Sequence, residues 1–148
     1  MRRPRYCTEC PLHPHRCSGA DCYYDHMEAR FDVIIAGSRG FNDYALLKQR
    51  CDRLFSQHRP TAIISGAARG ADTLGERYAK ERGIPVKQFP AQWDRYGKRA
   101  GYLRNEEMLT AADGLVAAWD GRSKGTAHMI RIAREKGIPV RIIRFKEQ

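Results

Sequence analysis

Two stretches of this chain share one pattern, and that pattern constrains the fold most. AKERGIPVKQF at residues 79–89 and AREKGIPVRII at residues 133–143 both pass from a charged helix end through Gly-Ile-Pro into an apolar segment. Gly83 and Gly137 suit the left-handed position that ends a helix, and the proline two residues later stops the helix from resuming. Each stretch is therefore predicted to be a helix that leads into a strand.

The same alternation extends from residue 31 to the end of the chain. Short apolar runs, several of them rich in Val and Ile, alternate with longer charged, amphipathic segments, as strands alternate with helices. The predicted strands cover residues 31–36, 61–64, 86–89, 114–118 and 140–143. The predicted helices cover residues 43–57, 71–82, 100–112 and 126–136. Such repeated units predict an α/β fold, a Rossmann-like three-layer sandwich with a mainly parallel sheet of about five strands.

The N-terminal residues have a different composition. Four of the five cysteines lie there, in a Pro-rich segment without helical or strand periodicity, so something other than a hydrophobic core must order it. The two-residue spacer between the first two cysteines lets one turn present two thiolates to a metal. We therefore predict one structural zinc ion in a small module. Its expected ligands are Cys7, Cys10, Cys17 and Cys22.

Alternatives to this ligand set remain open. The later cysteine pair departs from the usual spacing, so one of the nearby histidines, His13, His15 or His26, can replace a cysteine. Reduced thiols, disulfides and an iron–sulfur cluster are the other interpretations, and a cytosolic setting disfavours disulfides. We place the zinc module at residues 1–29 and the α/β domain at residues 30–148. Cys51 lies in a predicted helix and is interpreted as a buried apolar residue.

The charge balance favours anionic partners. The chain has 27 Lys and Arg against 17 Asp and Glu, a net charge of +10, which suits nucleic acid or phosphorylated ligands. No segment approaches the ~18 apolar residues of a membrane-spanning helix. The first thirty residues also lack the apolar stretch of a secretory signal. We therefore expect a cytoplasmic protein that does not contact membranes.

Three glycine-containing loops follow the first, second and fourth predicted strands. They begin with GSRG at residue 37, SGAARGAD at residue 65 and WDGRSKGT at residue 119. In an open parallel sheet, ligands bind beyond the carboxyl ends of the strands, where such loops meet helix N-termini. Glycines let backbone amides approach a phosphate, and arginines add charge-assisted contacts. None of the loops matches the GxGxxG fingerprint or the P-loop, so neither a standard NAD site nor a Walker ATP site is indicated.

A fourth segment, WDRYGKRAGYLRN at residues 93–105, alternates aromatic and cationic side chains. It can stack on a base and neutralise phosphate, or pack on the sheet as an amphipathic loop. A single glycine loop can likewise be a tight turn whose polar residue caps a helix. Arg104 and Asp120 are the candidate catalytic residues. The candidate ligand-binding residues are Gly37, Ser38, Arg39, Gly40, Gly66, Arg69, Gly70, Asp72, Trp93, Arg104, Asn105, Trp119, Asp120, Gly125 and Thr126.

Four ordered motifs together resemble the SLOG superfamily. They are GSRGF (37–41), SGAARGAD (65–72), RNEEM (104–108) and WDGRSKGT (119–126). This Rossmann-like group includes the DprA DNA-processing proteins and the LOG cytokinin-activating phosphoribohydrolases, and the chain resembles in particular its YspA-type, YpsA-related subgroup. The resemblance covers about residues 31–145. It implies a pocket for nucleotides or nucleotide-derived small molecules.

The resemblance to the LOG enzymes is partial. Arg104 and Met108 match their Arg-x-x-x-Met helix motif, and residues 125–126 match part of a GGxGTxxE loop whose Glu assists departure of the base. Met129 stands at the position of that Glu, and a thioether transfers no proton at neutral pH. Substitutes for the Glu would be Asp120, Asp72 or His128, although His128 more often has a packing role.

Three functions follow from the resemblance and the composition. The first is a sensor or ligand-binding protein for a nucleotide or nucleotide derivative. The second is a LOG-like nucleotide N-glycosidase, a phosphoribohydrolase. The third is DprA-like binding of single-stranded nucleic acid, whose affinity should fall steeply with salt. The expected partner is thus a nucleotide-derived small molecule, and single-stranded nucleic acid and further copies of the chain are left open.

Overall fold

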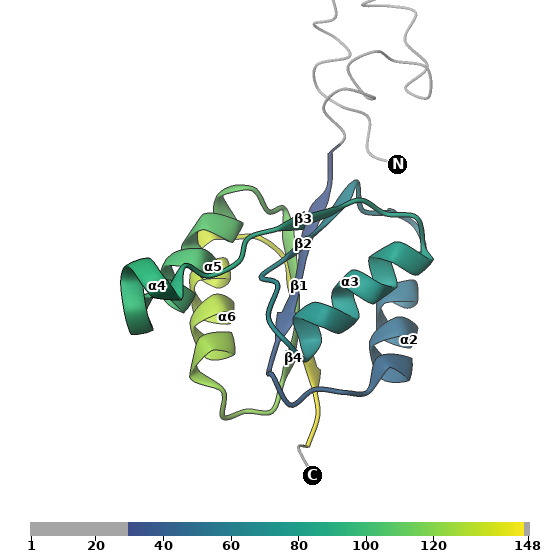
Figure 1. Ribbon diagram of the computed structural model, residues 1–148. Helices are drawn as coiled ribbons and strands as arrows, with labels where there is room; N and C mark the ends of the chain where they lie inside the picture. Colours follow the sequence, from purple (N-terminus) through teal and green to yellow (C-terminus); the bar gives the residue numbers. More distant parts are fainter. Residues whose placement is uncertain (1–29, 147–148) are drawn as a thin grey trace, which may run out of the picture. The chain divides into compact units, whose positions relative to one another are not determined.

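The structure, a computed structural model, describes residues 30–146, so the predicted zinc module lies outside the described residues. Residues 30–146 form a five-stranded parallel sheet between two layers of helices (Figure 1). This confirms the prediction of an α/β, Rossmann-like sandwich. No helix in this part of the chain is long and apolar enough to cross a membrane.

The elements follow the predicted order. The strands are β1 (Asp32–Gly37), β2 (Ala62–Ser65), β3 (Val86–Gln88), β4 (Gly114–Trp119) and β5 (Val140–Arg144). The helices are α2 (Tyr44–Leu54), α3 (Ala71–Glu81), α4 (Trp93–Tyr96), the 3₁₀ helix η2 (Gly97–Arg99), α5 (Ala100–Thr110) and α6 (Lys124–Lys136). The sequence did not indicate α4 and η2, because a single turn has no periodicity to detect. Gly83 and Gly137 have the predicted left-handed conformation, with φ of +68° and +84°.

The strand order is β3-β2-β1-β4-β5, and every pair is parallel. From β1 the chain moves outward through β2 to β3, and it then returns to the other side of β1 to form β4 and β5. The order therefore reverses between β1 and β4. In such sheets the loops beyond the carboxyl ends of the two strands diverge and leave a crevice in which ligands bind.

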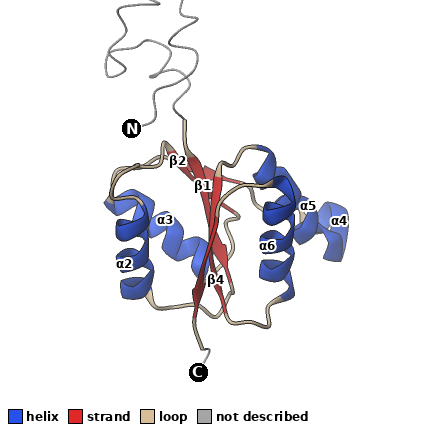
Figure 2. Cartoon of the chain, turned by 180° about the vertical axis from the view of Figure 1, so that it is seen from behind, coloured by secondary structure: helices blue, strands red, loops and turns tan. Residues whose placement is uncertain are grey.

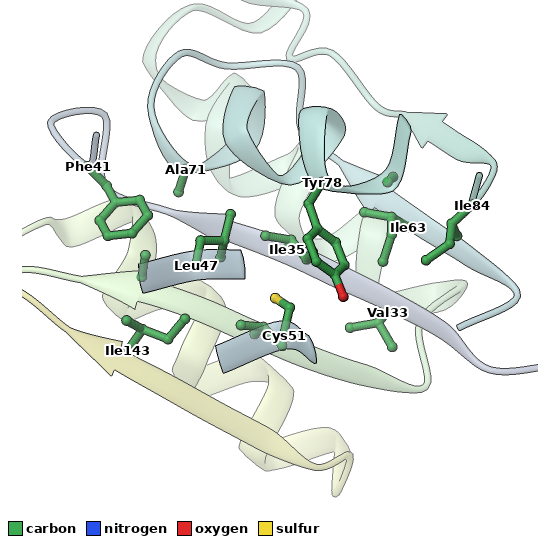
Figure 3. Packing of buried hydrophobic residues seen from close by; sticks show 13 residues of the cluster. Val33, Ile35, Phe41, Leu47, Cys51, Ile63, Ala71, Tyr78, Ile84 and Ile143 are labelled. Carbon is green, nitrogen blue, oxygen red and sulfur yellow. The ribbon is translucent and has the colours of Figure 1, made fainter. Parts of the chain in front are cut away.

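Each face of the sheet has its own hydrophobic core. Alternate residues of β1 point to opposite faces, so Val33 and Ile35 pack under α2 and α3 while Ile34 packs under α5 and α6. Figure 2 shows the two helical layers, and Figure 3 shows the core under α2 and α3. Cys51 is fully buried in that core, as predicted, and burial raises the pKa of its thiol to about 12.

Two glycines let neighbouring elements approach closely enough to position the loops of the carboxyl edge. A Cβ at Gly37 would lie 2.2 Å from the carbonyl oxygen of Ala118, so the end of β1 lies directly against β4. A Cβ at Gly75 would lie 2.7 Å from Cγ2 of Ile35, so α3 lies close on β1. The loops that follow β1 and β2 are thereby held together at one edge of the sheet.

Candidate functional site

A pocket of about 460 Å³ lies at the carboxyl edge of the sheet, where the strand order reverses. Its walls come from the loop after β1, the loop after β2, the segment from α4 to α5, and the loop between β4 and α6. The predicted residues in its lining are Gly37, Ser38, Arg39, Gly40, Asp72, Trp93, Arg104, Asn105, Asp120, Gly125 and Thr126. The four sequence motifs thus meet around one cavity.

Four predicted residues lie outside this lining. Gly66 and Arg69 line a second hollow of about 450 Å³ beside the first. Gly70 packs beneath the loops, because a Cβ there would lie 2.5 Å from the carbonyl oxygen of Arg39. The indole of Trp119 points elsewhere: its Nε1 donates to the carbonyl of Ser123 over 3.1 Å, and the ring lines a separate hollow against α6.

Arg104 connects the two hollows and the elements around them. Its Nη1 donates to the backbone carbonyl of Gly66 over 2.6 Å, and its Nε donates to Oδ1 of Asn105 over 3.2 Å. Burial lowers the pKa of the guanidinium from its ordinary value, and the nearby Asp72 opposes that shift. Arginine stays charged even so, because its ordinary pKa is above 12. The pocket therefore contains a fixed cation with defined orientation.

Asp72 is a buried carboxyl of the pocket with a shifted pKa. The residue is 5% exposed, and its Oδ2 accepts the backbone N–H of Ala68 over 3.2 Å. Burial raises the pKa of the carboxyl to about 6, although Arg104 and the Ala68 N–H favour the charged form. Glu76 on the same helix raises the pKa further. The carboxyl can therefore hold or release a proton near neutral pH.

Asn105 and His128 form a contact between α5 and α6. Nδ2 of Asn105 lies 3.2 Å from both the carbonyl oxygen of Gly125 and Nδ1 of His128. The His128 ring also packs edge-on against Tyr102, with centroids 4.6 Å apart. Burial lowers the pKa of the imidazole, so the neutral ring that accepts at Nδ1 is favoured. His128 is a packing residue next to the pocket and does not line it.

The loop between β4 and α6 presents a helix N-terminus to the pocket. Asp120 shapes this loop, because its Oδ1 accepts the backbone N–H groups of Arg122 and Ser123, each over 2.8 Å. Ser123 is the N-cap of α6, but its side chain makes no capping hydrogen bond to the first turn. A Cβ at Gly125 would meet no atom within 4 Å. The positive end of the helix is thus open to an anion.

Several lining residues were not among the sequence candidates. They are Ala36, Ala68, Lys98, Gly101, Tyr102, Met108, Ser123 and Met129. Lys98 and Tyr102 belong to the aromatic and basic segment, so the sequence contained a signal for them. Met108 and Met129 are each 1% exposed and form apolar lining. Both stand at motif positions of the resemblance to the LOG enzymes, so that resemblance, and not a local pattern, is the signal that could have placed them in the pocket.

The described residues offer no metal centre. Between residues 30 and 146, no group of three or more His, Cys, Asp or Glu side chains could hold a metal ion. The predicted ligands Cys7, Cys10, Cys17 and Cys22 lie outside the described residues. The zinc prediction therefore stays a prediction.

Comparisons with known proteins agree with this architecture. The family model YAcAr, described as the YspA, cpYpsA-related SLOG family, matches residues 31–96. The chain is also 39% identical over 115 residues to the Gene 61 protein of Mycobacterium phage D29, an alignment that covers 73% of this chain and 92% of that protein. No solved structure matches the chain. The matched residues 31–96 include the loops after β1 and β2 that line the pocket.

Proposed function

We propose that this chain, which belongs to the YspA, cpYpsA-related SLOG family, binds a nucleotide or nucleotide-derived small molecule at the carboxyl edge of its sheet, as a sensor or ligand-binding protein. The observation that carries the proposal is the convergence of three glycine loops and Arg104 on one pocket at the strand-order reversal. Ligands of open α/β sheets bind at such positions. The pocket volume of about 460 Å³ also suits a small molecule.

The charged groups of the pocket are suited to binding a phosphate group. Arg39, Lys98 and Arg104 line it, and the N-terminus of α6 adds backbone N–H groups and the positive end of the helix dipole. Asp72 and Asp120 are the acidic residues in the lining. The three cations outnumber these two carboxyl groups, and one of the two, Asp120, already accepts two backbone N–H groups. The pocket therefore offers more accessible positive than negative charge.

The aromatic and apolar side chains of the pocket are suited to contacts with the base and the sugar of a nucleotide. Trp93 is 47% exposed at the pocket wall, and the Arg39 guanidinium lies 5.8 Å from the centroid of its ring. An indole face of this kind stacks on a nucleobase, and an adjacent cation strengthens the contact. Met108 and Met129 supply apolar surface next to Asn105, whose amide can orient a polar group of the ligand.

Isothermal titration calorimetry tests the proposal with the full chain and a panel of AMP, cyclic AMP, ADP and ADP-ribose. At least one of these ligands should bind, and Arg104→Ala should weaken that binding by about tenfold or more, because it removes a charge-assisted contact. Arg77→Ala is the matched control, since Arg77 lies on α3 outside both hollows. An absence of binding across the panel would overturn the proposal.

A second candidate is hydrolysis of the N-glycosidic bond of a bound nucleotide, which one observation favours. The Asp72 carboxyl lines the pocket and holds a proton near pH 6, so it can protonate the departing base while water adds to C1′ of the ribose. Chromatography of AMP incubated with the protein should then reveal free adenine and ribose 5-phosphate. Asp72→Asn should abolish this release. No release from the wild-type protein at high concentration would exclude this activity.

We also propose that residues 1–29 bind one structural zinc ion through Cys7, Cys10, Cys17 and Cys22, on the cysteine spacing alone. Four protein ligands leave no open position for water, so the metal would order the segment without catalysing a reaction. Elemental analysis of the purified chain should find about one zinc per chain. The double variant Cys7→Ser, Cys10→Ser should lose the metal, and Cys51→Ala should retain it. A wild-type chain without zinc would contradict the proposal.

A further inference from the structure

We infer that the ligand is longer than a mononucleotide: it is a nucleotide joined through a diphosphate to a second group, which occupies the hollow between the loop after β2 and the segment before α4. This inference rests on the proposed function and names the ligand class of the same site. It is carried by the way two hollows share one cationic wall.

The two hollows are neighbours of similar size. The first has a volume of about 460 Å³ and the second about 450 Å³. Their shared lining residues are Arg39, Ala68, Trp93 and Arg104. A ligand that fills only the first hollow would leave the second open beside it. A ligand with two ends would use both and would cross at the shared residues.

The crossing point has the charge that a diphosphate needs. Arg39 and Arg104 both line the two hollows, and the Gly66 carbonyl holds the Arg104 guanidinium in place over 2.6 Å. Arginine suits this role because its planar fork of donors matches two oxygens of a phosphate group. Two arginines at one crossing point complement two linked phosphates better than the single phosphate of a mononucleotide.

The lining of the second hollow leaves room for the second group of the ligand. Its other walls are the small residues Gly66, Ala67, Pro90 and Ala91 together with Arg69. Glycine at residue 66 lets two side-chain ends approach the loop, because a Cβ there would lie 2.5 Å from Nη1 of Arg104 and 2.8 Å from Oδ2 of Asp72. The small side chains leave room for a ring, and the exposed Arg69 supplies a cation at its edge. A sugar or a second nucleoside fits this chemistry.

Calorimetry with three probes tests the inference: AMP, ADP-ribose, and the phosphodiester-linked dinucleotide pApA. The wild-type chain should bind ADP-ribose about tenfold or more tightly than AMP, since only ADP-ribose places a second group beyond two phosphates. Ala91→Trp fills the second hollow, and Arg69→Ala removes its cation. Each variant should lower the affinity for ADP-ribose by about fivefold or more and change the affinity for AMP by less than about twofold.

Matched controls separate this effect from a general loss of folding. Ala45→Trp adds the same side chain at an exposed position of α2, and Arg77→Ala removes an arginine outside both hollows. Neither should change the affinity for either ligand. Because Arg69 is exposed, its variant keeps the test decisive even where Ala91→Trp fails to fold.

The outcomes distinguish the inference from the function on which it rests. Equal wild-type affinities for AMP and ADP-ribose would overturn the inference and leave nucleotide binding intact. Tighter binding of pApA than of ADP-ribose would overturn the claim that the ligand contains a diphosphate, and would indicate that the site binds a nucleic-acid strand. An absence of binding for all three probes would overturn both the inference and the proposed function.

Discussion

The guanidinium of Arg104 on α5 donates to the backbone carbonyl of Gly66, 2.6 Å away in the loop after β2. This bond joins two elements that are far apart in the sequence, and it fixes the cation that lies between the two hollows. Glycine at residue 66 permits this contact, since a Cβ there would lie 2.5 Å from Nη1 of Arg104. The position of the Arg104 side chain therefore depends on the glycine at residue 66.

Arg104→Lys should weaken nucleotide binding although it keeps the positive charge. Lysine presents a single ammonium group and cannot reach Gly66 and a phosphate with the same planar fork. We expect a loss of about tenfold in affinity for ADP-ribose by calorimetry. Gly66→Ala should cause a similar loss because it displaces Arg104 without removing the charge. Wild-type affinity in both variants would show that the position of Arg104 is unimportant.

Asp72→Asn should change how folding stability depends on pH. The folded-state pKa of about 6 lies above the ordinary 3.8, so the folded protein binds the proton more tightly than the unfolded chain. The stability contribution of Asp72 is therefore full below about pH 4 and is lost as the pH rises through 6. The variant should match wild type near pH 4 and exceed its unfolding free energy by about 2–3 kcal/mol at pH 7.5.

Urea denaturation of both proteins at several pH values measures this difference. The comparison isolates Asp72, because the other titratable groups are common to the two chains. Asparagine keeps an oxygen that accepts the N–H of Ala68, so the backbone contact is preserved. A stability difference that does not change between pH 4 and 7.5 would contradict the burial argument.

Two helical glycines should respond in opposite ways to alanine. Gly75→Ala should destabilise the protein by about 1–3 kcal/mol, because the new Cβ would meet Ile35 at 2.7 Å in a packed core. Gly125→Ala should leave stability unchanged or raise it by up to about 1 kcal/mol, because space is open there and alanine favours the helix. Thermal unfolding followed by circular dichroism measures both. Equal effects would mean that α3 does not lie close on β1.

The two tryptophans should report differently on ligand binding. Trp93 is exposed at the pocket wall, whereas Trp119 is held by Ser123 on the α6 side. Stacking of a base on Trp93 should quench its fluorescence. Trp93→Phe should therefore lose most of the signal change on addition of ADP-ribose, and Trp119→Phe should retain it. Quenching that persists in Trp93→Phe would place the base elsewhere.

Much of the fold was predictable because its signals are local. The repeated Gly-Ile-Pro units marked two helix ends and the strands that follow them, and Gly83 and Gly137 have the expected backbone conformation. Short apolar runs located β1, β2 and β4, which are buried on both faces. The short α4 and η2 escaped prediction, because one turn contains too few residues for a periodic pattern.

The site was predictable in outline, because carboxyl ends of parallel strands share one edge. The direction of each side chain was not predictable, as Trp119 illustrates. It directly precedes Asp120 in the same motif, yet its indole donates to the carbonyl of Ser123 and lines a separate hollow. The division of the site into two hollows likewise depends on how α5 meets the loop after β2.

The most direct test of nucleotide binding is a map of backbone amide NMR shifts during titration with ADP-ribose. The largest shifts should cluster at residues 37–40, 66–72, 101–105 and 120–126, which surround the two hollows. Amides of α2, on the opposite face of the sheet from α5 and α6, should change little. Absent shifts, or shifts confined to α2 and the outer edge at β5, would contradict the central claim.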